Sequence, residues 1–265
     1  MDKVSVIMGI YNIPSKEILK KAIESILMQT YQNIEFIIID DGSTNDTYNW
    51  AKELTQNDTR VILRKNEKNL GLTKTLNIAL KLSTGDIIAR MDGDDYCEQN
   101  RIEKQLDFLK KNKEYSLVAS NISLFDANGI WGNRKNSEVI NKKDFLFTSP
   151  IPHPTILTYK WCFDLVDGYD EKWYTNRNED YDIFMKMFSK GIKMYVIQEN
   201  LYYYREDKNC YSKRKYRYRI CEFVVRLKGF YSLKLYPKAL FYVIKPLIVG
   251  LIPQQVLKKM RKNKI

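Results

Sequence analysis

Apolar runs and helical spacings alternate along the first 125 residues of the chain. Residues 35–40 contain the apolar run Phe36-Ile37-Ile38-Ile39, which is typical of a strand buried on both faces of a parallel sheet. Elsewhere, apolar residues recur every three or four positions, as at Leu19, Ile23 and Ile26, and this period predicts amphipathic helices. The predicted strands are 4–11, 35–40, 60–63, 87–91 and 117–122, and the predicted helices are 18–30, 47–56, 72–82 and 101–111. This order predicts an α/β fold with a Rossmann-like, mostly parallel central sheet and helices on both faces.

After residue 125 the alternation becomes less regular. Asp126-Ala127-Asn128-Gly129 predicts a hairpin turn. The later segments predict a short helix at 143–147, a strand at 155–159, an amphipathic helix at 181–190, and two late strands at 194–196 and 201–204.

The positive charge of the chain is concentrated at its end. The formal net charge is +12, and the residues from Arg205 onward hold 17 Lys/Arg against 3 Asp/Glu, whereas the first 204 residues hold 27 against 29. This segment contains two apolar stretches, 218–235 and 239–253, and the second is shorter than the roughly 20 residues of a membrane-spanning helix. We therefore expect residues 205–265 to form a basic helical extension that lies on an anionic membrane surface. A solvated helix face and a nucleic-acid-binding patch are the alternatives, and we expect no nucleic acid partner.

The N-terminus and the cysteines indicate a reducing compartment. Met1-Asp2-Lys3 leads directly into a predicted strand, without the long apolar stretch of a signal peptide. The four cysteines lack the spacing of a zinc or redox motif, so reduced thiols are expected.

Three acidic clusters follow or border the predicted elements. Asp40-Asp41 closes one strand, Asp92-Gly93-Asp94-Asp95 closes another, and Glu179-Asp180 precedes the predicted helix at 181–190. Ligands of an open parallel sheet bind at the carboxyl ends of its strands, where clustered carboxylates need a cation or a hydrogen-bonding ligand. An Asp-x-Asp pair offers hard oxygen ligands suited to Mg²⁺ or Mn²⁺. Alone, such a pair is more often a solvated turn.

Further residues extend these clusters into a longer pattern. The pattern comprises Asp40-Asp41-Gly42-Ser43, Asn69-Leu70-Gly71-Leu72, Asn77, Gly85-Asp86, Ala89-Arg90-Met91-Asp92-Gly93-Asp94-Asp95, Arg101, Gln105, His153-Pro154-Thr155 and Glu179-Asp180. In this combination the chain resembles the family-2 glycosyltransferases, including bacterial capsular and surface-polysaccharide transferases. The resemblance implies the GT-A fold, an inverting reaction, a nucleotide-diphosphate sugar donor, and Mn²⁺ or Mg²⁺ as cofactor. We expect a catalytic domain, 1–204, with a nucleotide-sugar half at about 1–125 and an acceptor half at about 126–204, followed by the tail 205–265, with the boundary near residue 205, where the charge balance shifts.

The resemblance implies a role for individual residues as well. Its nucleotide-binding residues are Tyr11, Asp40, Asp41, Asn69, Arg90 and Asp92. Asp94 is the main direct metal ligand that it implies, with Asp92 and Asp95 beside it. UDP is the preferred carrier, because a carboxylate such as Asp41 can accept the uracil imide N–H.

Asp180, preceded by Glu179, is implied as the general base that deprotonates the acceptor hydroxyl. Inversion by direct displacement needs one such base and a stabilised leaving group, without an enzyme nucleophile. The alternative is an acidic pair that only complements a helix dipole. His153 lies between two prolines and either faces the acceptor pocket or the metal or is held in a rigid turn.

The chain departs from the family pattern after Tyr204-Arg205, where many members carry a histidine near the diphosphate. Here Glu206-Asp207-Lys208 follows, so Arg205, Lys208 or another cation of the tail would have to replace it.

The sequence thus predicts a transferase that moves a hexose or N-acetylhexosamine to a hydroxyl of a polyprenyl-linked glycan. We expect it in the cytoplasm, peripherally associated with the inner face of the cell membrane. The alternatives are a non-catalytic protein that binds glycans or nucleotide sugars on the same fold, and a nucleotidyltransferase. The latter would carry a glycine-rich, basic signature near the N-terminus, whereas Met8-Gly9-Ile10-Tyr11-Asn12 has one glycine and no arginine.

Overall fold

The structure, a computed structural model, describes residues 2–206 and 215–252. The strands are β1 (Val4–Ile10), β2 (Ile34–Asp40), β3 (Val61–Lys65), β4 (Ile87–Asp92), β5 (Tyr96–Cys97), β6 (Leu117–Asp126), β7 (Gly129–Arg134), β8 (Leu157–Tyr159) and β9 (Met194–Arg205). The α-helices are α1 (Lys16–Leu27), α2 (Thr47–Thr55), α3 (Leu72–Leu82), α4 (Arg101–Lys111), α5 (Trp161–Asp164), α6 (Glu179–Ser189), α7 (Tyr216–Ser232) and α8 (Leu240–Leu251). Three short 3₁₀ helices are η1 (Asp144–Leu146), η2 (His153–Thr155) and η3 (Trp173–Thr175).

The strands of the described residues form one sheet in the order β3-β2-β1-β4-β8-β6-β9-β5, with β7 paired to β6. β1, β2, β3 and β4 are mutually parallel. β8 runs antiparallel to both β4 and β6, so β6 points the same way as β4, and β9 is parallel to β6. The long strands of this mixed sheet therefore bring their carboxyl ends to one edge, here called the carboxyl edge.

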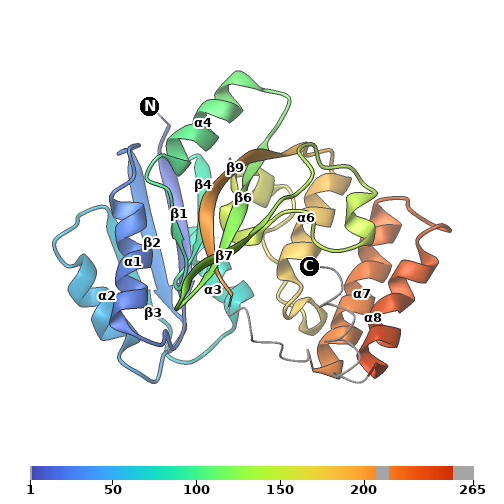
Figure 1. Cartoon of the computed structure of the whole chain (residues 1–265), viewed down its shortest axis with the longest axis horizontal. Helices are drawn as coiled ribbons and strands as arrows, with labels where there is room; N and C mark the ends of the chain where they lie inside the picture. Colours follow the sequence, from blue (N-terminus) through green and yellow to red (C-terminus); the bar gives the residue numbers. More distant parts are fainter. Residues whose placement is uncertain (1, 207–214, 253–265) are drawn as a thin grey trace.

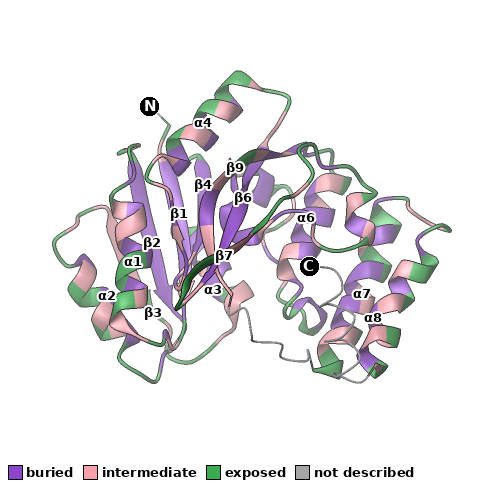
Figure 2. Cartoon of the chain, viewed as in Figure 1, coloured by how far each residue is buried: buried purple, intermediate pink, exposed green. Residues whose placement is uncertain are grey.

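Helices cover both faces of the sheet (Figure 1), and each face has its own core. In β2, Phe36 and Ile38 point to the core with α1 and α4, while Ile37 and Ile39 point to the core with α3 and α6. Successive side chains of a strand alternate between faces, so a strand buried on both is apolar at most of its positions. Figure 2 shows the resulting buried sheet between helices with exposed outer sides.

The C-terminal helices are built into the second of these cores. Val225 and Phe230 of α7 are fully buried with residues of α6, and Val243 of α8 belongs to the same cluster. The predicted helical extension is confirmed. Residues on both sides of the predicted boundary at residue 205 share one hydrophobic core. The division into a catalytic domain, 1–204, and a membrane-associating tail, 205–265, therefore stays a prediction. Within the two described ranges, no helix is both long and apolar enough to cross a membrane.

The sequence-based elements of the first half are confirmed with small differences at their ends, whereas several later ones were wrong in form. The two strands predicted at 194–196 and 201–204 are one strand, β9, because the polar residues between them form register shifts against β6 instead of a break. The predicted strand at 155–159 begins later, at Leu157, after η2. The helix predicted at 143–147 is a 3₁₀ turn, η1.

The thiols described in the structure agree with the expected reduced state. Cys97, Cys162 and Cys221 are buried and free, while Cys210 lies outside the described residues.

Candidate active site at the carboxyl edge

The topology brings distant segments to the carboxyl edge. β2 ends there at Asp40 and β4 at Asp92. Because β8 is antiparallel to β4, the residues that precede it, in η2, lie at the same edge. β9 ends there as well, at Arg205.

A cavity of about 730 Å³ opens at this edge. Its walls include Arg90 and Asp92 of β4, His153 of η2, Glu179 and Asp180 of α6, and Tyr204 of β9. Five of the predicted site residues, from three separate segments, thus line one cavity.

Arg90 and Asp92 form a bidentate ion pair in this wall. The Arg90 guanidinium is 3% exposed and donates to the two carboxylate oxygens of Asp92 at 2.5 and 3.1 Å. Burial disfavours the charge of Arg90, but Asp92 and neighbouring groups outweigh it and raise the pKa of the guanidinium above its ordinary value. A permanent, nearly buried cation therefore stands at the end of β4.

Two buried polar residues hold this cation and the histidine in place. Arg101 is fully buried and donates to the carbonyl oxygens of Arg90, at 2.9 Å, and Pro154, at 3.1 Å. Gln105 accepts from Arg101 at 3.0 Å and donates to the carbonyl of Thr155 at 2.7 Å. These residues therefore connect α4 to β4 and η2, which gives them a positioning role behind the cavity.

The carboxylates after β4 crowd one another. Burial and the nearby charge of Asp92 raise the pKa of Asp94, and burial with Asp92 and Asp94 raises the pKa of Asp95. Asp95 is 2% exposed and accepts from the Tyr202 hydroxyl at 2.9 Å and the Arg205 backbone N–H at 2.7 Å. A cation would relieve this crowding, so the donor set fits a hard divalent ion.

The same residues indicate how such an ion would be held. Within the part of the chain that the structure describes, no group of three or more His, Cys, Asp or Glu side chains is arranged to hold a metal. Mg²⁺ is commonly bound by one or two carboxylates together with substrate phosphates. Asp94 and Asp92 could serve in that arrangement, although both oxygens of Asp92 are paired with Arg90 and Asp95 is bound by Tyr202 and Arg205. The roles of all three as ligands stay predictions.

Asp40 and Asp41 hold the loops beside the cavity. Asp40 is fully buried and accepts the backbone N–H of Ser43 at 2.8 Å. Asp41 accepts the backbone N–H groups of Leu70, at 2.8 Å, and Gly71, at 2.9 Å. Asp40 thus shapes the turn after β2, and Asp41 shapes the loop on which Asn69 lies.

The other two predicted nucleotide-binding residues, Tyr11 and Asn69, are exposed. Tyr11, Asp40, Asp41 and Asn69 do not line the cavity, so their contacts with a nucleotide stay predictions.

Glu179 and Asp180 are the first two residues of α6, where the sequence had placed them before the helix. Burial, and then the charge of Asp180, raises the pKa of Glu179 to about 7. The next acidic residue of this turn, Asp182, instead forms an ion pair with Lys186 at 2.7 Å. A carboxylate that titrates near neutrality inside a cavity is a candidate for proton transfer.

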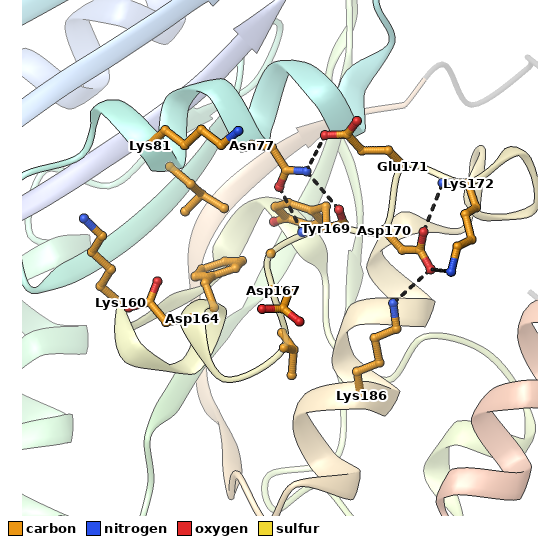
Figure 3. A pocket seen from close by; sticks show the side chains of 14 residues that line it. Asn77, Lys81, Lys160, Asp164, Asp167, Tyr169, Asp170, Glu171, Lys172 and Lys186 are labelled. Atoms are coloured by element: carbon orange, nitrogen blue, oxygen red, sulfur yellow. Dashed lines mark hydrogen bonds and ion pairs between the residues drawn. The ribbon is translucent and has the colours of Figure 1, made fainter.

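His153 is held by a neighbour that the sequence did not indicate. Its Nε2 lies 2.7 Å from the hydroxyl of Tyr169, and burial lowers the pKa of the imidazole well below its ordinary value. Asn77 fixes the backbone of Tyr169, accepting its N–H and donating to its carbonyl, both at 2.9 Å (Figure 3). Asn77, a member of the residue pattern that resembles family-2 glycosyltransferases, thus positions Tyr169, the partner of His153.

A second cavity, of about 950 Å³, has Tyr169 in its wall (Figure 3). Lysines and carboxylates from α3, α5, α6 and the turn after α5 surround it, and several are paired with one another, such as Lys186 with Asp170 at 3.2 Å. None of the predicted site residues lines it.

Sequence reasoning missed Tyr169, Tyr204 and Arg134 as residues of this region; the latter two line the first cavity. Gly168 was an available signal for a turn before Tyr169, because glycine adopts positive φ without steric cost. Gly168 has φ +69° and lies so close to Asn77 that a Cβ would come within 2.8 Å of the Asn77 amide oxygen.

Comparison with known proteins agrees with this geometry. The sequence profile of the family described as glycosyl transferase family 2 matches residues 5–178 of this chain. EpsE of Bacillus subtilis (strain 168), whose name classes it as a glycosyltransferase, is 36% identical over 264 residues, covering 99% of this chain and 94% of its own. The Escherichia coli UDP-Glc:alpha-D-GlcNAc-diphosphoundecaprenol beta-1,3-glucosyltransferase WfaP is 30% identical over 229 residues, covering 82% of each chain. The structure of S. aureus TarS with UDP-GlcNAc superposes with a TM-score of 0.71 at 17% identity, covering 92% of this chain and 73% of that one, which supports the GT-A-like fold.

Proposed function

The chain belongs to glycosyl transferase family 2, a family of inverting enzymes, and we propose that it transfers a hexose or N-acetylhexosamine from a UDP-sugar to a hydroxyl of a polyprenyl-linked glycan. Such a reaction would serve the synthesis of a surface polysaccharide. The donor and acceptor are proposed from the name of WfaP, which acts with UDP-glucose on a diphosphoundecaprenol-linked sugar.

The observation that carries the proposal is the cavity that unites Arg90 and Asp92 with Glu179 and Asp180. A glycosyl transfer with inversion needs the leaving group and the attacking hydroxyl on opposite sides of the sugar carbon. The residues at the end of β4 offer a site for the leaving diphosphate, and the start of α6 offers a base for the hydroxyl. One cavity with both groups in its walls suits direct displacement.

For the leaving group, Asp94 and Asp92 would hold Mn²⁺ or Mg²⁺, and the ion would neutralise charge on the departing diphosphate. Arg205 is the cation we propose in place of the family histidine. Its guanidinium donates to the carbonyl of Asp94 at 3.0 Å and packs 4.7 Å from the centre of the Phe125 ring. This places a fixed positive charge beside the acidic turn.

For the acceptor, Asp180 would remove the hydroxyl proton as the hydroxyl oxygen attacks the anomeric carbon. Glu179 would modulate it, because an ionised Glu179 adds negative charge beside Asp180 and makes it a stronger base. The neutral imidazole of His153, oriented by Tyr169 and packed against Phe184 of α6, would face the acceptor from the cavity wall.

We place the reaction at the cytoplasmic face of a membrane, where a polyprenyl-linked acceptor is presented. The basic segment 205–265 would face the anionic lipid surface.

The test is transfer from radiolabelled UDP-sugars to a synthetic diphosphoundecaprenol-linked N-acetylglucosamine in detergent. We expect product with at least one UDP-sugar, and a loss of about 10²–10⁴-fold in rate for Asp180→Asn. Full activity of that variant would remove Asp180 from its role. A lack of transfer or donor hydrolysis with every UDP-, GDP- and dTDP-sugar would contradict the proposal itself.

A further inference from the structure

Helix α8 is apolar on nearly every side but is packed on only one. Lys245 is the single charged residue among its 12. Val243, Pro246 and Gly250 are buried, and they form the side that faces α7 and the core. A helix that is apolar all round normally has all its sides covered.

The opposite side of α8 is exposed to solvent. Its large apolar residues are 41 to 72% exposed: Leu240, Phe241, Ile244, Ile248 and Leu251. Their spacing of three or four residues places them on one face of the helix. α8 is also an outermost element, at the end of the molecule away from α2 (Figure 1). A contiguous apolar face of this kind marks an interaction surface, whereas single exposed apolar residues are ordinary.

The length of α8 restricts how it can meet a membrane. At about 1.5 Å per residue, its 12 residues extend roughly 18 Å, against a hydrocarbon thickness of about 30 Å. One side also remains occupied by α7. The helix can therefore lie in the plane of the interface with its outer face in the lipid, as amphipathic surface helices do.

The surrounding charge favours an anionic lipid surface over a second copy of the chain. From residue 223 to 265 the sequence holds 10 Lys/Arg and no Asp/Glu. Lys234 and Lys238, in the turn before α8, are exposed. In a symmetric dimer through this face, these cations would meet their own copies, which is unfavourable. Acidic headgroups would instead neutralise them.

We propose that the outer face of α8 inserts into the headgroup region of an anionic bilayer, with the lysines around it binding acidic lipids. The inference rests on the proposed function for its biological sense, since a lipid-linked acceptor requires the enzyme at the membrane. The face would anchor the catalytic body while α7 stays in the core.

Co-sedimentation with vesicles tests this with the full-length protein. The probes are vesicles of phosphatidylcholine alone and with about one third phosphatidylglycerol. The variant is F241Q/I248Q/L251Q, whose residues are 49 to 72% exposed, and the control is M28Q/I130Q/L165Q, which changes apolar residues elsewhere that are 44 to 59% exposed. A second variant, K234Q/K238Q/K245Q, reports on charge. Circular dichroism and hydrolysis of the UDP-sugar show that each variant is folded and active.

We expect the protein to bind the anionic vesicles, with the partition coefficient lowered on the order of 100-fold by the apolar variant and by the lysine variant alike. The control should bind as the unchanged protein does. Equal binding by the apolar variant, or no binding of the unchanged protein, would overturn the proposal. So would a dimer, seen by sedimentation equilibrium, that the apolar variant abolishes. Donor hydrolysis is measured separately, so failure of the anchor and failure of the proposed enzyme activity are distinguishable.

Discussion

The pH dependence of transfer depends on Glu179, because burial beside Asp180 raises the pKa of its carboxyl to about 7. An ordinary glutamate has a pKa of 4.5 and is fully charged at neutral pH. Here the side chain is half ionised at pH 7 and about one tenth ionised at pH 6. If Asp180 is the base, the rate should rise through this range, since each newly ionised Glu179 makes Asp180 more basic.

The size of the rise follows from the causes of the pKa change. Moving a pKa from 4.5 to about 7 corresponds to roughly 3 kcal/mol, and the charge of Asp180 is the smaller cause after burial. We assign about 1 kcal/mol to the mutual effect of the two carboxylates, which acts on Asp180 as it does on Glu179. If about half of this energy is expressed in the transition state, the upper plateau should be about twofold above the lower one.

The perturbation is Glu179→Gln, which keeps the shape of the side chain and removes its ionisation. Initial rates of UDP release between pH 5.5 and 8.5 should show two plateaus for the unchanged enzyme and a flat profile at the lower plateau for the variant. Asp180→Asn should lose about 10²–10⁴-fold at every pH. A step near pH 7 that persists in Glu179→Gln, or a loss in that variant as large as in Asp180→Asn, would refute the division of roles.

Three further predictions concern stability and the histidine. Burial opposes the charge of Glu35, but hydrogen bonds to its carboxylate outweigh burial and lower its pKa to about 2. The ionised side chain therefore contributes fully to the free energy of unfolding above about pH 4.5, and this contribution is lost as the pH falls towards 2. Urea unfolding at pH 6 and pH 3 should show that this part of the acid sensitivity disappears in Glu35→Gln. Asn77→Ala removes the hydrogen bonds that hold the turn at Tyr169 and should lower the free energy of unfolding by about 2–3 kcal/mol, measured by denaturant titration. Tyr169→Phe removes the partner of His153 and should lower kcat/KM for the acceptor about tenfold while the Kd of the UDP-sugar, measured by calorimetry, stays unchanged.

The first half of the fold could be predicted because its signals are local. β1 and β2 are buried on both faces, so their sequences are apolar at most positions, and the acidic residues Asp40-Asp41 at the end of β2 stand out. α3 and α4 carry apolar residues at helical spacing and have the predicted bounds. Strand order and helix coverage then follow from the preferences of βα units.

The second half depends on contacts between distant residues. β8 has three residues, and its pairing with β4 and β6 decides that η2 reaches the carboxyl edge, which no local pattern indicates. The polar residues inside β9 resemble a loop, and only their register shifts against β6 keep them in the strand.

The candidate site shows the same limit. The acidic residues could be found from their types and positions, but their partners could not. Asp41 is held by backbone N–H groups of a loop about 30 residues further along, and His153 by a tyrosine brought in by Asn77. The sequence had not indicated that α7 contributes to the main core, because its basic residues suggested a separate tail.

The central claim is that the carboxyl edge binds a UDP-sugar together with a divalent ion. Calorimetric titration of UDP-sugars with and without Mn²⁺, for the unchanged protein and for Asp94→Asn, tests it most directly. We predict binding that strengthens at least tenfold with the metal, and loss of this metal dependence in Asp94→Asn while the protein remains folded. Binding of equal strength with and without Mn²⁺, or metal dependence retained in the variant, would contradict the account.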